Sequence, residues 1–400
     1  MRKKILIIAM GNSVHTVRWI KNIEDLNCDI YLFSSFTIPF VSNKGCYSPK
    51  IKLFNFRPEG EKYLKCALKN PIISLSLLKT FNLTTVKTGL HRFVVEDERK
   101  MLTKVLNKNK FDIIHTLHTQ TSAFLLQEAL KYTTNLSKFK WIHTVWGSDL
   151  YLYQWFEESR HMLKNLLPQI DYYWGEGTRD YNLAIQLGFR GKFLSPVPAF
   201  GGVDIEFIRG LEYKVPSQRK YIIVKGYQNV VGRADIIFHA LEMCADVLNN
   251  YEIIIMSYEN EIIPTVGKLF SAKYNVRVTC ISDVSYDDVI KMHLQSRVFI
   301  ALSVSDGLPA SFIEAMSCGE FPIQSNTSMA SEWVEDGKSA FLVNPGNTNE
   351  VAKAIRKALT DDEFVDSAGV INREIIFQKL SKDSVGNKIR NTYSEILNDN

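Results

Sequence analysis

Residues 305–319 read SDGLPASFIEAMSCG, a stretch that predicts the end of a buried strand, a tight turn and the start of a helix. The apolar run 298–304 before it is typical of a parallel strand, and ligands usually bind just beyond the carboxyl end of such a strand. Gly307 permits the turn, Pro309 suits the first position of a helix, and residues 312–316 give that helix an apolar face. The stretch therefore indicates an α/β fold with a site where this strand ends.

The start of the predicted helix favours an anion. Its first backbone N–H groups, around Ala310 and Ser311, have no partner within the helix and stand at the positive end of the helix dipole. Such groups bind phosphate without needing a metal ion. We therefore expect residues 307–311 to bind a diphosphate.

Two carboxylates flank this helix start. Asp306 lies just before the helix and Glu314 lies within it, so both can accept hydrogen bonds from sugar hydroxyl groups on either side of the phosphates. The alternative is that Asp306 is an ordinary N-cap and Glu314 a solvated helix residue, which a short motif leaves equally open. On the first interpretation the stretch binds a nucleotide sugar.

The length and composition of the chain indicate two globular domains. It has 400 residues, and single domains commonly hold roughly 100 to 200. Apolar residues make up 46% of the chain, and no run of about eighteen uncharged apolar residues predicts a membrane span. The short apolar run 5–10 is interpreted as a first strand and not as a signal peptide, because polar residues soon follow it.

Cysteine usage is typical of a cytoplasmic protein. None of the six cysteines stands in a CxxC or other metal-binding spacing, which favours reduced thiols and argues against structural zinc. No metal and no resident cofactor are predicted.

Basic residues are concentrated between residues 50 and 110, where fourteen Lys and Arg face five acidic residues. Apolar residues alternate with these charges, a composition that attracts anionic lipid headgroups. The inner face of the cell membrane is therefore a candidate partner for this segment. A solvated helix pair that packs its apolar stripe inward is the alternative. Nucleic acid is not expected as a partner, because no nucleic-acid-binding motif accompanies the charge.

Both halves of the chain alternate predicted strands and helices, which is the pattern of βα units around a parallel sheet. Strands are predicted at residues 4–10, 30–34, 111–115, 139–145, 171–175 and 193–194, and again at 221–225, 251–257, 276–281, 298–303, 321–324 and 340–343. Helices are predicted at residues 13–26, 179–187, 234–249, 261–273, 286–296, 350–359 and 381–397. Proline and glycine concentrate in residues 195–204, as in a linker between two Rossmann-like domains.

Three motifs make the chain similar to the retaining glycosyltransferases of the GT-B fold, family 4 (glycosyl transferases group 1). In residues 305–319, seven residues separate Asp306 from Glu314, as in the family, which usually has Glu at the first position. Residues 201–204, GGVD, are similar to the family's linker, and residues 332–343, EWVEDGKSAFLV, are similar to the segment that follows its acidic motif. The resemblance covers most of the chain but not residues 50–99.

The resemblance implies two Rossmann-like domains whose parallel sheets face a central cleft. We expect an acceptor-binding domain over residues 1–200 and a nucleotide-sugar-binding domain over residues 201–380. A C-terminal helix over residues 381–400 is expected to pack back on the first domain.

The resemblance also implies metal-independent transfer of a sugar from a nucleotide diphosphate, UDP or GDP, with retention at the anomeric carbon. Fixed positive charge must then stabilise the leaving diphosphate. Lys225 ends a predicted strand and Arg233 follows Gly232 at a helix start, so both are candidates, with ordinary surface charge as the alternative. The expected donor-binding residues are Gly11, Asn12, Lys225, Arg233, Gly307, Leu308, Pro309, Ala310, Ser311 and Glu314.

Three residues of the first half are candidates for binding the acceptor. His15 lies at the start of the predicted helix after Gly11, His118 follows the predicted strand 111–115, and Asp149 ends the motif WGSD at residues 146–149, which resembles an element of the family. Structural roles as a capping residue or a hydrogen-bonded histidine are the alternatives. The expected catalytic residues are Asp306, Glu314, His118, Lys225 and Arg233.

The predicted function is that of a retaining, hexosyltransferase-like enzyme that acts on a glycan or lipid-linked acceptor in bacterial surface polysaccharide synthesis. One alternative is another GT-B-like enzyme, such as a sugar-nucleotide epimerase or a phosphorylase. A second is a non-catalytic subunit that binds nucleotide sugars, which the shorter carboxylate Asp306 and the separation of His115 from His118 suggest.

Overall fold

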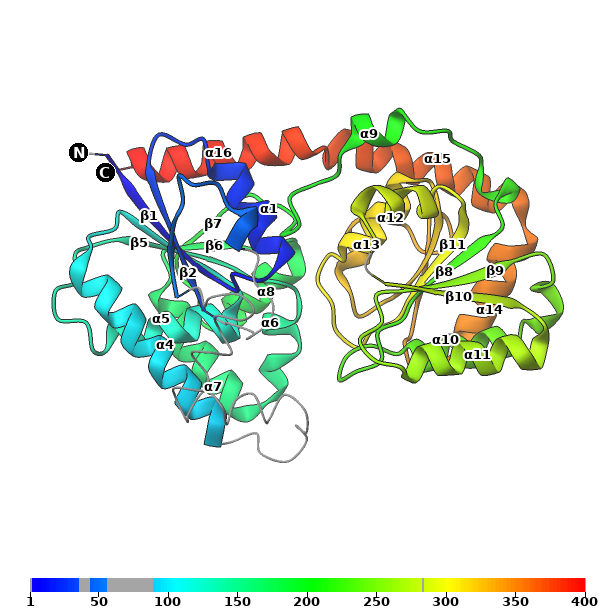
Figure 1. Cartoon of the computed structure of the whole chain (residues 1–400), viewed down its shortest axis with the longest axis horizontal. Helices are drawn as coiled ribbons and strands as arrows, with labels where there is room; N and C mark the ends of the chain where they lie inside the picture. Colours follow the sequence, from blue (N-terminus) through cyan, green and yellow to red (C-terminus); the bar gives the residue numbers. More distant parts are fainter. Residues whose placement is uncertain (1, 36–43, 56–88, 283, 400) are drawn as a thin grey trace. The chain divides into compact units, whose positions relative to one another are not determined.

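The computed structural model of the chain describes residues 2–35, 44–55, 89–282 and 284–399 (Figure 1). The chain divides into two compact units, Met1–Gly201 with Gly386–Asn400, and Gly202–Val385. The first boundary falls within the predicted linker. The second falls inside the last helix, so the final residues of the chain belong to the first unit.

The described part of the first unit contains a seven-stranded sheet in which every strand pairs in parallel, in the order β3-β2-β1-β4-β5-β6-β7. Its strands are β1 (Lys4–Ala9), β2 (Asp29–Ser34), β3 (Lys52–Phe54), β4 (Ile113–Leu117), β5 (Lys140–Thr144), β6 (Tyr172–Trp174) and β7 (Lys192–Phe193). Its helices are α1 (Val14–Ile23), α4 (Gly89–Lys108), α5 (Phe124–Leu130), α6 (Ser148–Tyr151), α7 (Glu157–Leu166), α8 (Thr178–Gln186) and the greater part of α16 (Lys382–Asn398).

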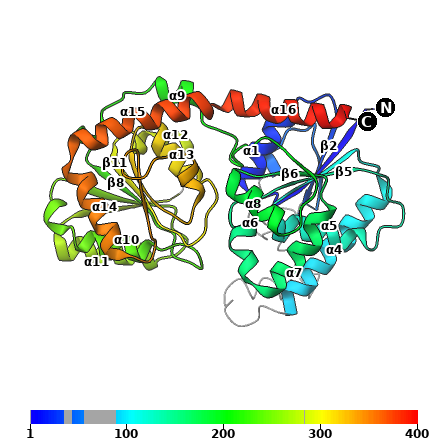
Figure 2. The same cartoon turned by 180° about the vertical axis from the view of Figure 1, so that it is seen from behind.

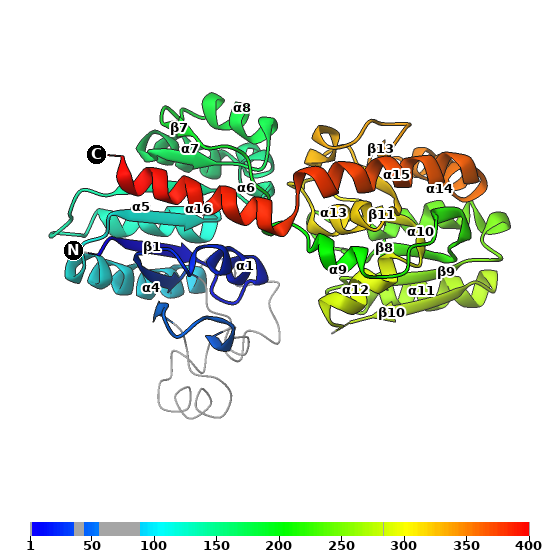
Figure 3. The same ribbon diagram turned by 90° about the horizontal axis from the view of Figure 1, so that it is seen from above.

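Helices cover both faces of this sheet (Figure 2). Helices α4, α5 and α7 contribute to the apolar core on one face. Helix α16 lies along the same unit as α1, as the view in Figure 3 shows. There the hydroxyl of the fully buried Tyr393 accepts a hydrogen bond of 3.1 Å from Trp19 and lies 2.5 Å from Nδ1 of His115. The end of the chain is thus bound to the centre of the first unit.

The second unit has a six-stranded parallel sheet in its described residues, in the order β10-β9-β8-β11-β12-β13. Its strands are β8 (Tyr221–Lys225), β9 (Glu252–Met256), β10 (Arg277–Ile281), β11 (Ser296–Ala301), β12 (Phe321–Ser325) and β13 (Phe341–Val343). Its helices are α9 (Ile205–Arg209), α10 (Ala234–Glu242), α11 (Ile262–Tyr274), α12 (Tyr286–His293), α13 (Ala310–Ser317), α14 (Thr348–Thr360) and α15 (Asp362–Lys379).

The apolar faces of α10, α11 and α14 pack on one face of this second sheet, and α12 and α13 lie on the other (Figure 1). Two parallel sheets, each with helices on both faces, confirm the predicted α/β architecture. The structure differs in detail, because the predicted helix 234–249 ends at Glu242 and is followed by a separate 3-10 turn, Ala245–Val247. Strand β3 and helices α5, α6, α7, α9 and α15 were not predicted from the sequence.

Two predictions about membranes and metals concern the whole chain. No helix among the described residues combines the length and the hydropathy that crossing a membrane requires. The central part of the basic segment, residues 56–88, lies outside the described residues, so its contact with a membrane stays a prediction. Across the described ranges, no three His, Cys, Asp or Glu side chains gather in a way that would hold a metal ion.

Candidate functional site

The second unit brings two predicted residues to one edge of its sheet. The strand order reverses between β8 and β11, and ligands of open α/β sheets bind at the carboxyl ends of the strands at such a point. Lys225 is the last residue of β8, and Asp306 follows β11 along the chain. The two residues therefore stand where the fold itself favours a binding site.

The side chains of Lys225 and Asp306 meet at this edge. Nζ of Lys225 lies 3.6 Å from Oδ2 of Asp306, and the two side chains are 15% and 31% exposed. The ammonium group also lies 4.6 Å from the ring centroid of Tyr227, a cation–π distance. The other carboxylate oxygen of Asp306 accepts a hydrogen bond of 2.9 Å from the N–H of Gly307. The positive charge of Lys225 is thus held in one place beside the glycine turn, on a largely buried side chain.

Helix α13 begins directly after this turn. Pro309 is its N-cap residue, and no side chain caps the start of the helix. The first N–H groups, those of Ala310 and Ser311, thus receive no capping side chain, and an anionic ligand can bind them. Binding of a diphosphate at this helix start stays a prediction.

Glu314 lies within α13, on a helix whose neighbouring residues Ile313 and Ala315 are fully buried. Only 9% of Glu314 is exposed, and no described residue forms a hydrogen bond or an ion pair with its carboxylate. The oxygens of this carboxylate are not among the fully buried polar atoms that lack a partner, so they reach the surface of the unit. From this position the carboxylate can accept a hydrogen bond from a ligand at the start of α13.

Arg233, the second predicted cation, has its guanidinium turned to its own loop. It donates to the carbonyl oxygens of Asn229 at 3.2 Å, Val230 at 3.4 Å and Gly232 at 2.7 Å. A Cβ at Gly232 would lie 2.3 Å from the carbonyl oxygen of Tyr227, so this loop requires glycine there. In the structure Arg233 therefore holds the loop together, while Lys225 supplies the positive charge next to Asp306.

The first unit repeats this arrangement with different side chains. Its strand order reverses between β1 and β4; Gly11 and Asn12 follow β1, and His118 follows β4. The carbonyl oxygen of Gly11 accepts a hydrogen bond of 2.9 Å from the hydroxyl of Tyr47. Ser13 caps α1 by accepting from the N–H of His15 at 3.2 Å. The predicted turn after the first strand is thus held by hydrogen bonds on both sides.

The predicted acceptor-binding residues of this unit gather around Trp146. The rings of His15 and His118 lie 5.6 Å and 5.8 Å from the Trp146 ring, between ring centroids. His118 has a positive φ of 76°, which is rare for a residue with a side chain. Its Nδ1 lies 3.0 Å from the hydroxyl of Thr121. Strained backbone of this kind clusters at functional sites.

Asp149 belongs to the same cluster of residues. It is 1% exposed, its Oδ2 accepts a hydrogen bond of 2.6 Å from the N–H of Thr119, and its Oδ1 lies 3.7 Å from Nε2 of His118. Asp149 thus holds the backbone that follows His118, and its second oxygen lies near the imidazole. The three predicted residues His15, His118 and Asp149 lie in one cluster.

Two further histidines lie in the interior of the first unit. His143 lies 2.9 Å from the hydroxyl of Thr116 and 3.0 Å from that of Thr119, and burial lowers its pKa to about 4. His115 is fully buried against Tyr393, and burial holds its pKa well below the usual range. Both are therefore neutral groups that support the fold. Of His115 and His118, only His118 reaches the cluster.

Sequence reasoning did not identify Tyr227, Thr119 or Tyr47 as parts of these groups. Tyr227 stands two residues after Lys225, and Thr119 directly follows His118. Both could have been identified because they lie next to a predicted site residue. Tyr47 reaches Gly11 from a segment far along the chain and had no such signal.

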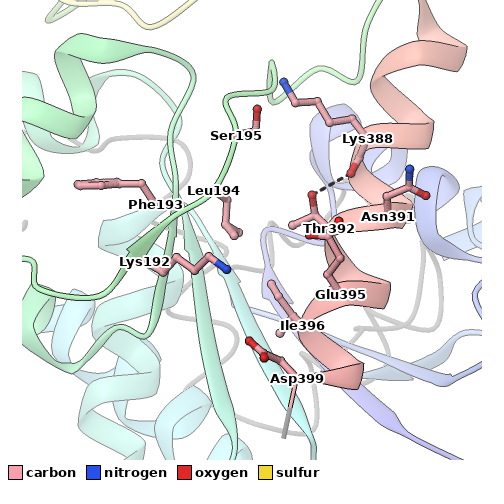
Figure 4. Close-up of a pocket in the computed structure, with 10 residues that line it drawn as sticks. All are labelled: Lys192, Phe193, Leu194, Ser195, Lys388, Asn391, Thr392, Glu395, Ile396 and Asp399. Carbon is pink, nitrogen blue, oxygen red and sulfur yellow. Dashed lines mark hydrogen bonds between the residues drawn. The ribbon is translucent and has the colours of Figure 1, made fainter.

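A hollow of 330 Å³ in the first unit contains none of the predicted site residues (Figure 4). It lies between residues 192–195 and α16. Nζ of Lys388 donates to the carbonyl oxygen of Pro196 at 2.8 Å, and the hydroxyl of Tyr172 donates to Asp399 at 3.3 Å. These contacts hold α16 against the end of the sheet, and the hollow is the space that remains beside them.

Comparison with known proteins supports the predicted family. Residues 237–374 match the family described as glycosyl transferases group 1, which confirms the predicted family for this part of the chain. N-acetyl-alpha-D-glucosaminyl L-malate synthase of Bacillus anthracis is 24% identical over 113 residues, 28% of this chain and 30% of that protein. The 56 kDa subunit of alpha,alpha-trehalose-phosphate synthase [UDP-forming] of Kluyveromyces lactis is 25% identical over 186 residues, 45% and 36%. The chain spans about a third of the length of these relatives.

Solved structures confirm the predicted GT-B fold over nearly the whole chain. Sucrose-phosphate synthase of Thermosynechococcus elongatus superposes with a TM-score of 0.73 at 15% identity, covering 99% of both chains. HepE of Anabaena, solved with UDP and glucose, superposes with a TM-score of 0.65 at 15% identity, covering 98% of this chain and all of the other.

Proposed function

We propose that this chain, a GT-B fold protein whose residues 237–374 match the family glycosyl transferases group 1, transfers a sugar from a nucleoside diphosphate sugar to an acceptor hydroxyl. The observation that carries the proposal is the carboxylate of Glu314, which lies in α13 behind a helix start without a capping side chain and forms no hydrogen bond or ion pair with a described residue. A sugar hydroxyl is the natural partner for this carboxylate, because hydroxyl groups donate hydrogen bonds and α13 begins with N–H groups suited to phosphate.

The donor binds at the second unit. Its diphosphate lies against the start of α13 and near Lys225, and its sugar lies within reach of Asp306 and Glu314. During transfer the bond between the anomeric carbon and the diphosphate oxygen breaks, and negative charge develops on the leaving oxygen. Lys225 and the N–H groups of α13 stabilise that charge from fixed positions, which is the most effective form of electrostatic catalysis.

The acceptor binds at the cluster of the first unit, where Asp149 lies beside His118. The acceptor oxygen attacks on the face that the diphosphate leaves, and the diphosphate takes the acceptor's proton. Retention of configuration follows from attack on that face. The scheme uses no separate protein nucleophile.

UDP is the donor nucleotide that we favour, because one relative is a UDP-forming synthase and one similar structure was solved with UDP and glucose. We further propose a cytoplasmic enzyme of surface polysaccharide synthesis whose acceptor is a glycan or a lipid-linked sugar. The basic segment 50–110 would bring it to the inner face of the membrane.

Thermal unfolding in the presence of UDP-, GDP-, ADP- and dTDP-sugars tests the proposed donor, because a ligand that binds the folded state raises the melting temperature. We expect one nucleotide sugar to raise it in the wild type and to lose this effect in Glu314→Gln. Glu335→Gln is the matched control, since that side chain is 70% exposed on the same unit. A wild type that responds to no nucleotide sugar would contradict the proposal.

A non-catalytic subunit that binds nucleotide sugars is the second candidate, favoured by the contact of 3.6 Å between Lys225 and Asp306, because this contact already neutralises the cation. Release of UDP from the donor separates the two candidates. An enzyme releases UDP when an acceptor is supplied and more slowly when water takes its place, whereas a binding subunit releases none with any acceptor.

A further inference from the structure

The C-terminal end of α13 is held by a polar cluster that the proposed reaction does not use. The helix ends at Ser317, and Gly319 follows with a positive φ of 73°. The N–H of Gly319 donates to the carbonyl oxygen of Met316 at 2.9 Å, and that of Glu320 donates to Ala315 at 3.0 Å. This is the usual glycine-based end of a helix, and it leaves the carbonyl oxygen of Cys318 for another donor.

Arg219 supplies that donor. Its guanidinium donates to the carbonyl oxygen of Cys318 at 2.8 Å. It also donates to the backbone carbonyl oxygens of Lys214 at 2.7 Å, His293 at 3.2 Å and Ser296 at 3.0 Å. The residue is 3% exposed. One buried side chain thus ties the end of α13 to the segment before β8 and to the turn between α12 and β11.

A second layer covers this contact. The guanidinium carbons of Arg219 and Arg373 lie 5.1 Å and 4.0 Å from the ring centroid of Tyr213. A Cβ at Gly319 would lie 2.8 Å from the hydroxyl of Tyr213 and 3.0 Å from Cδ of Arg373. The side chains of Tyr213 and Arg373 can therefore pack this close to the end of α13 only because residue 319 has no side chain.

The charges of the cluster complement the helix. The C-terminal end of a helix carries partial negative charge, and Glu320 adds a full charge beside it. Glu320 lies 2.6 Å from Nδ1 of His293, and both side chains are fully buried. Arg219 and Arg373 bring positive charge to the same place. Burying such groups is costly, and well-packed apolar residues often stabilise a fold at least as well, so stability alone is a weak reason for this cluster.

We propose that Arg219 is a positioning residue for donor binding, because it fixes the far end of the helix whose start binds the diphosphate. The eight residues of α13 span about 12 Å, so a tilt at Cys318 displaces both the first N–H groups and Glu314. Displacements of this size are large against the tolerance of a binding site. The inference rests on the proposed function for the identity of the ligand, but not for the ordering of α13.

Arg219→Lys tests the proposal, because it keeps the charge and loses the fork that joins four carbonyl oxygens. The matched control is Arg297→Lys. Arg297 is 1% exposed in the same unit and donates to the carbonyl oxygen of Ala358 and to Asp362, not to α13. Arg373→Gln, at a half-buried position, is the second variant for the case in which Arg219→Lys does not fold.

Two measurements are compared. Each is made at the same number of degrees below the melting temperature of the variant concerned. Hydrogen exchange should be at least tenfold faster at the amides of residues 310–318 in Arg219→Lys and Arg373→Gln than in Arg297→Lys. The dissociation constant for UDP, measured by calorimetry, should rise about tenfold in the first two variants, with KM for the donor rising in parallel. Arg297→Lys should leave both quantities within twofold of the wild type.

Equal exchange of α13 in all variants would overturn the proposal, because Arg219 would then be a structural residue only. Faster exchange with unchanged affinity for UDP would overturn it as well. If the wild type binds no nucleotide, the proposed function fails, while the exchange measurement still decides whether Arg219 orders α13.

Discussion

The ammonium group of Lys225 lies 3.6 Å from the carboxylate of Asp306, at the point where the strand order of the second unit reverses. A cation and an anion so placed can serve the two parts of a nucleotide sugar, the diphosphate and the hydroxyl groups. They also partly neutralise each other in the absence of ligand. Removing the cation and removing the anion should therefore change the binding of UDP in opposite directions.

Replacing Lys225 by Gln should weaken both donor binding and transfer. The variant loses the fixed charge that stabilises the leaving diphosphate, and transfer should fall by roughly 100-fold or more. Initial rates of UDP release measure the effect. Lys220→Gln removes an exposed lysine five positions earlier and should keep nearly full activity; comparable losses in both variants would count against a role for Lys225.

Replacing Asp306 by Asn should strengthen the binding of free UDP and still reduce transfer. The substitution removes a negative charge beside the expected phosphate position, so the affinity for UDP should rise a few-fold. It also removes an acceptor for the donor sugar, so kcat should fall about tenfold or more. Calorimetry with UDP and steady-state rates check the two parts, and a loss of UDP affinity would show that Asp306 does not act through this charge.

Replacing Asp149 by Asn should separate transfer from hydrolysis of the donor. Asp149 accepts from the N–H of Thr119 at 2.6 Å and lies 3.7 Å from His118, so the variant loses the carboxylate charge beside the imidazole. Transfer to the acceptor should fall by roughly tenfold to 100-fold, whereas hydrolysis of the donor should stay within about twofold. An equal fall in both rates would instead indicate a general loss of structure, which the melting temperature would reveal.

The stability of the first unit should fall as the pH falls from about 6.5 to about 4. Burial lowers the pKa of His143 to about 4, so the unfolded chain binds a proton in this range that the folded chain does not. Stability is thus fully present above pH 6.5 and decreases on acidification. At about 1.4 kcal/mol per pKa unit the loss amounts to roughly 3 kcal/mol, and His115 contributes with the same sign.

Urea unfolding followed by tryptophan fluorescence at several pH values measures this dependence, since Trp19, Trp141 and Trp174 are buried in the first unit. The variant His143→Gln should show a shallower dependence on pH. His161→Gln removes an exposed histidine and should follow the wild type. A wild type whose stability is the same at pH 7 and pH 4.5 would contradict the prediction.

Replacing Tyr393 by Phe should destabilise the first unit by roughly 1–3 kcal/mol, because the buried N–H of Trp19 and the ring of His115 lose their common partner. Urea unfolding by fluorescence measures the change. Tyr132→Phe alters a tyrosine that is 56% exposed on the same unit and should change the free energy of unfolding by less than about 0.5 kcal/mol. Equal effects would mean that the Tyr393 hydroxyl does not stabilise α16 on the unit.

The residues at the strand ends were predictable because each follows a recognisable apolar run. Lys225 ends the run 222–224, and Asp306 follows the run 298–302, so a parallel sheet brings them to one edge in any fold of this class. The order of strands at that edge comes from the Rossmann-like topology, which the alternation of elements indicates.

The orientation of Arg233 and the cluster around Arg219 were not predictable in this way. The guanidinium of Arg233 follows the backbone of its loop, which depends on the close approach of Gly232 to Tyr227. Arg219, Tyr213 and Arg373 come from separate segments and meet only after the second unit has folded. Contacts of this kind carry no local pattern, because each residue alone is typical of a surface.

The return of the chain to its first unit also sets the order in which the protein can form. Residues 202–385 leave the ribosome before residues 386–398, so the second unit has its complete sequence while the first still lacks the helix that contacts Trp19 and His115. Domains usually fold in the order of synthesis, but here the unit that is begun first is finished last. We expect a chain that is truncated before residue 386 and released from the ribosome to carry a protease-resistant second unit and a first unit that proteases still cut.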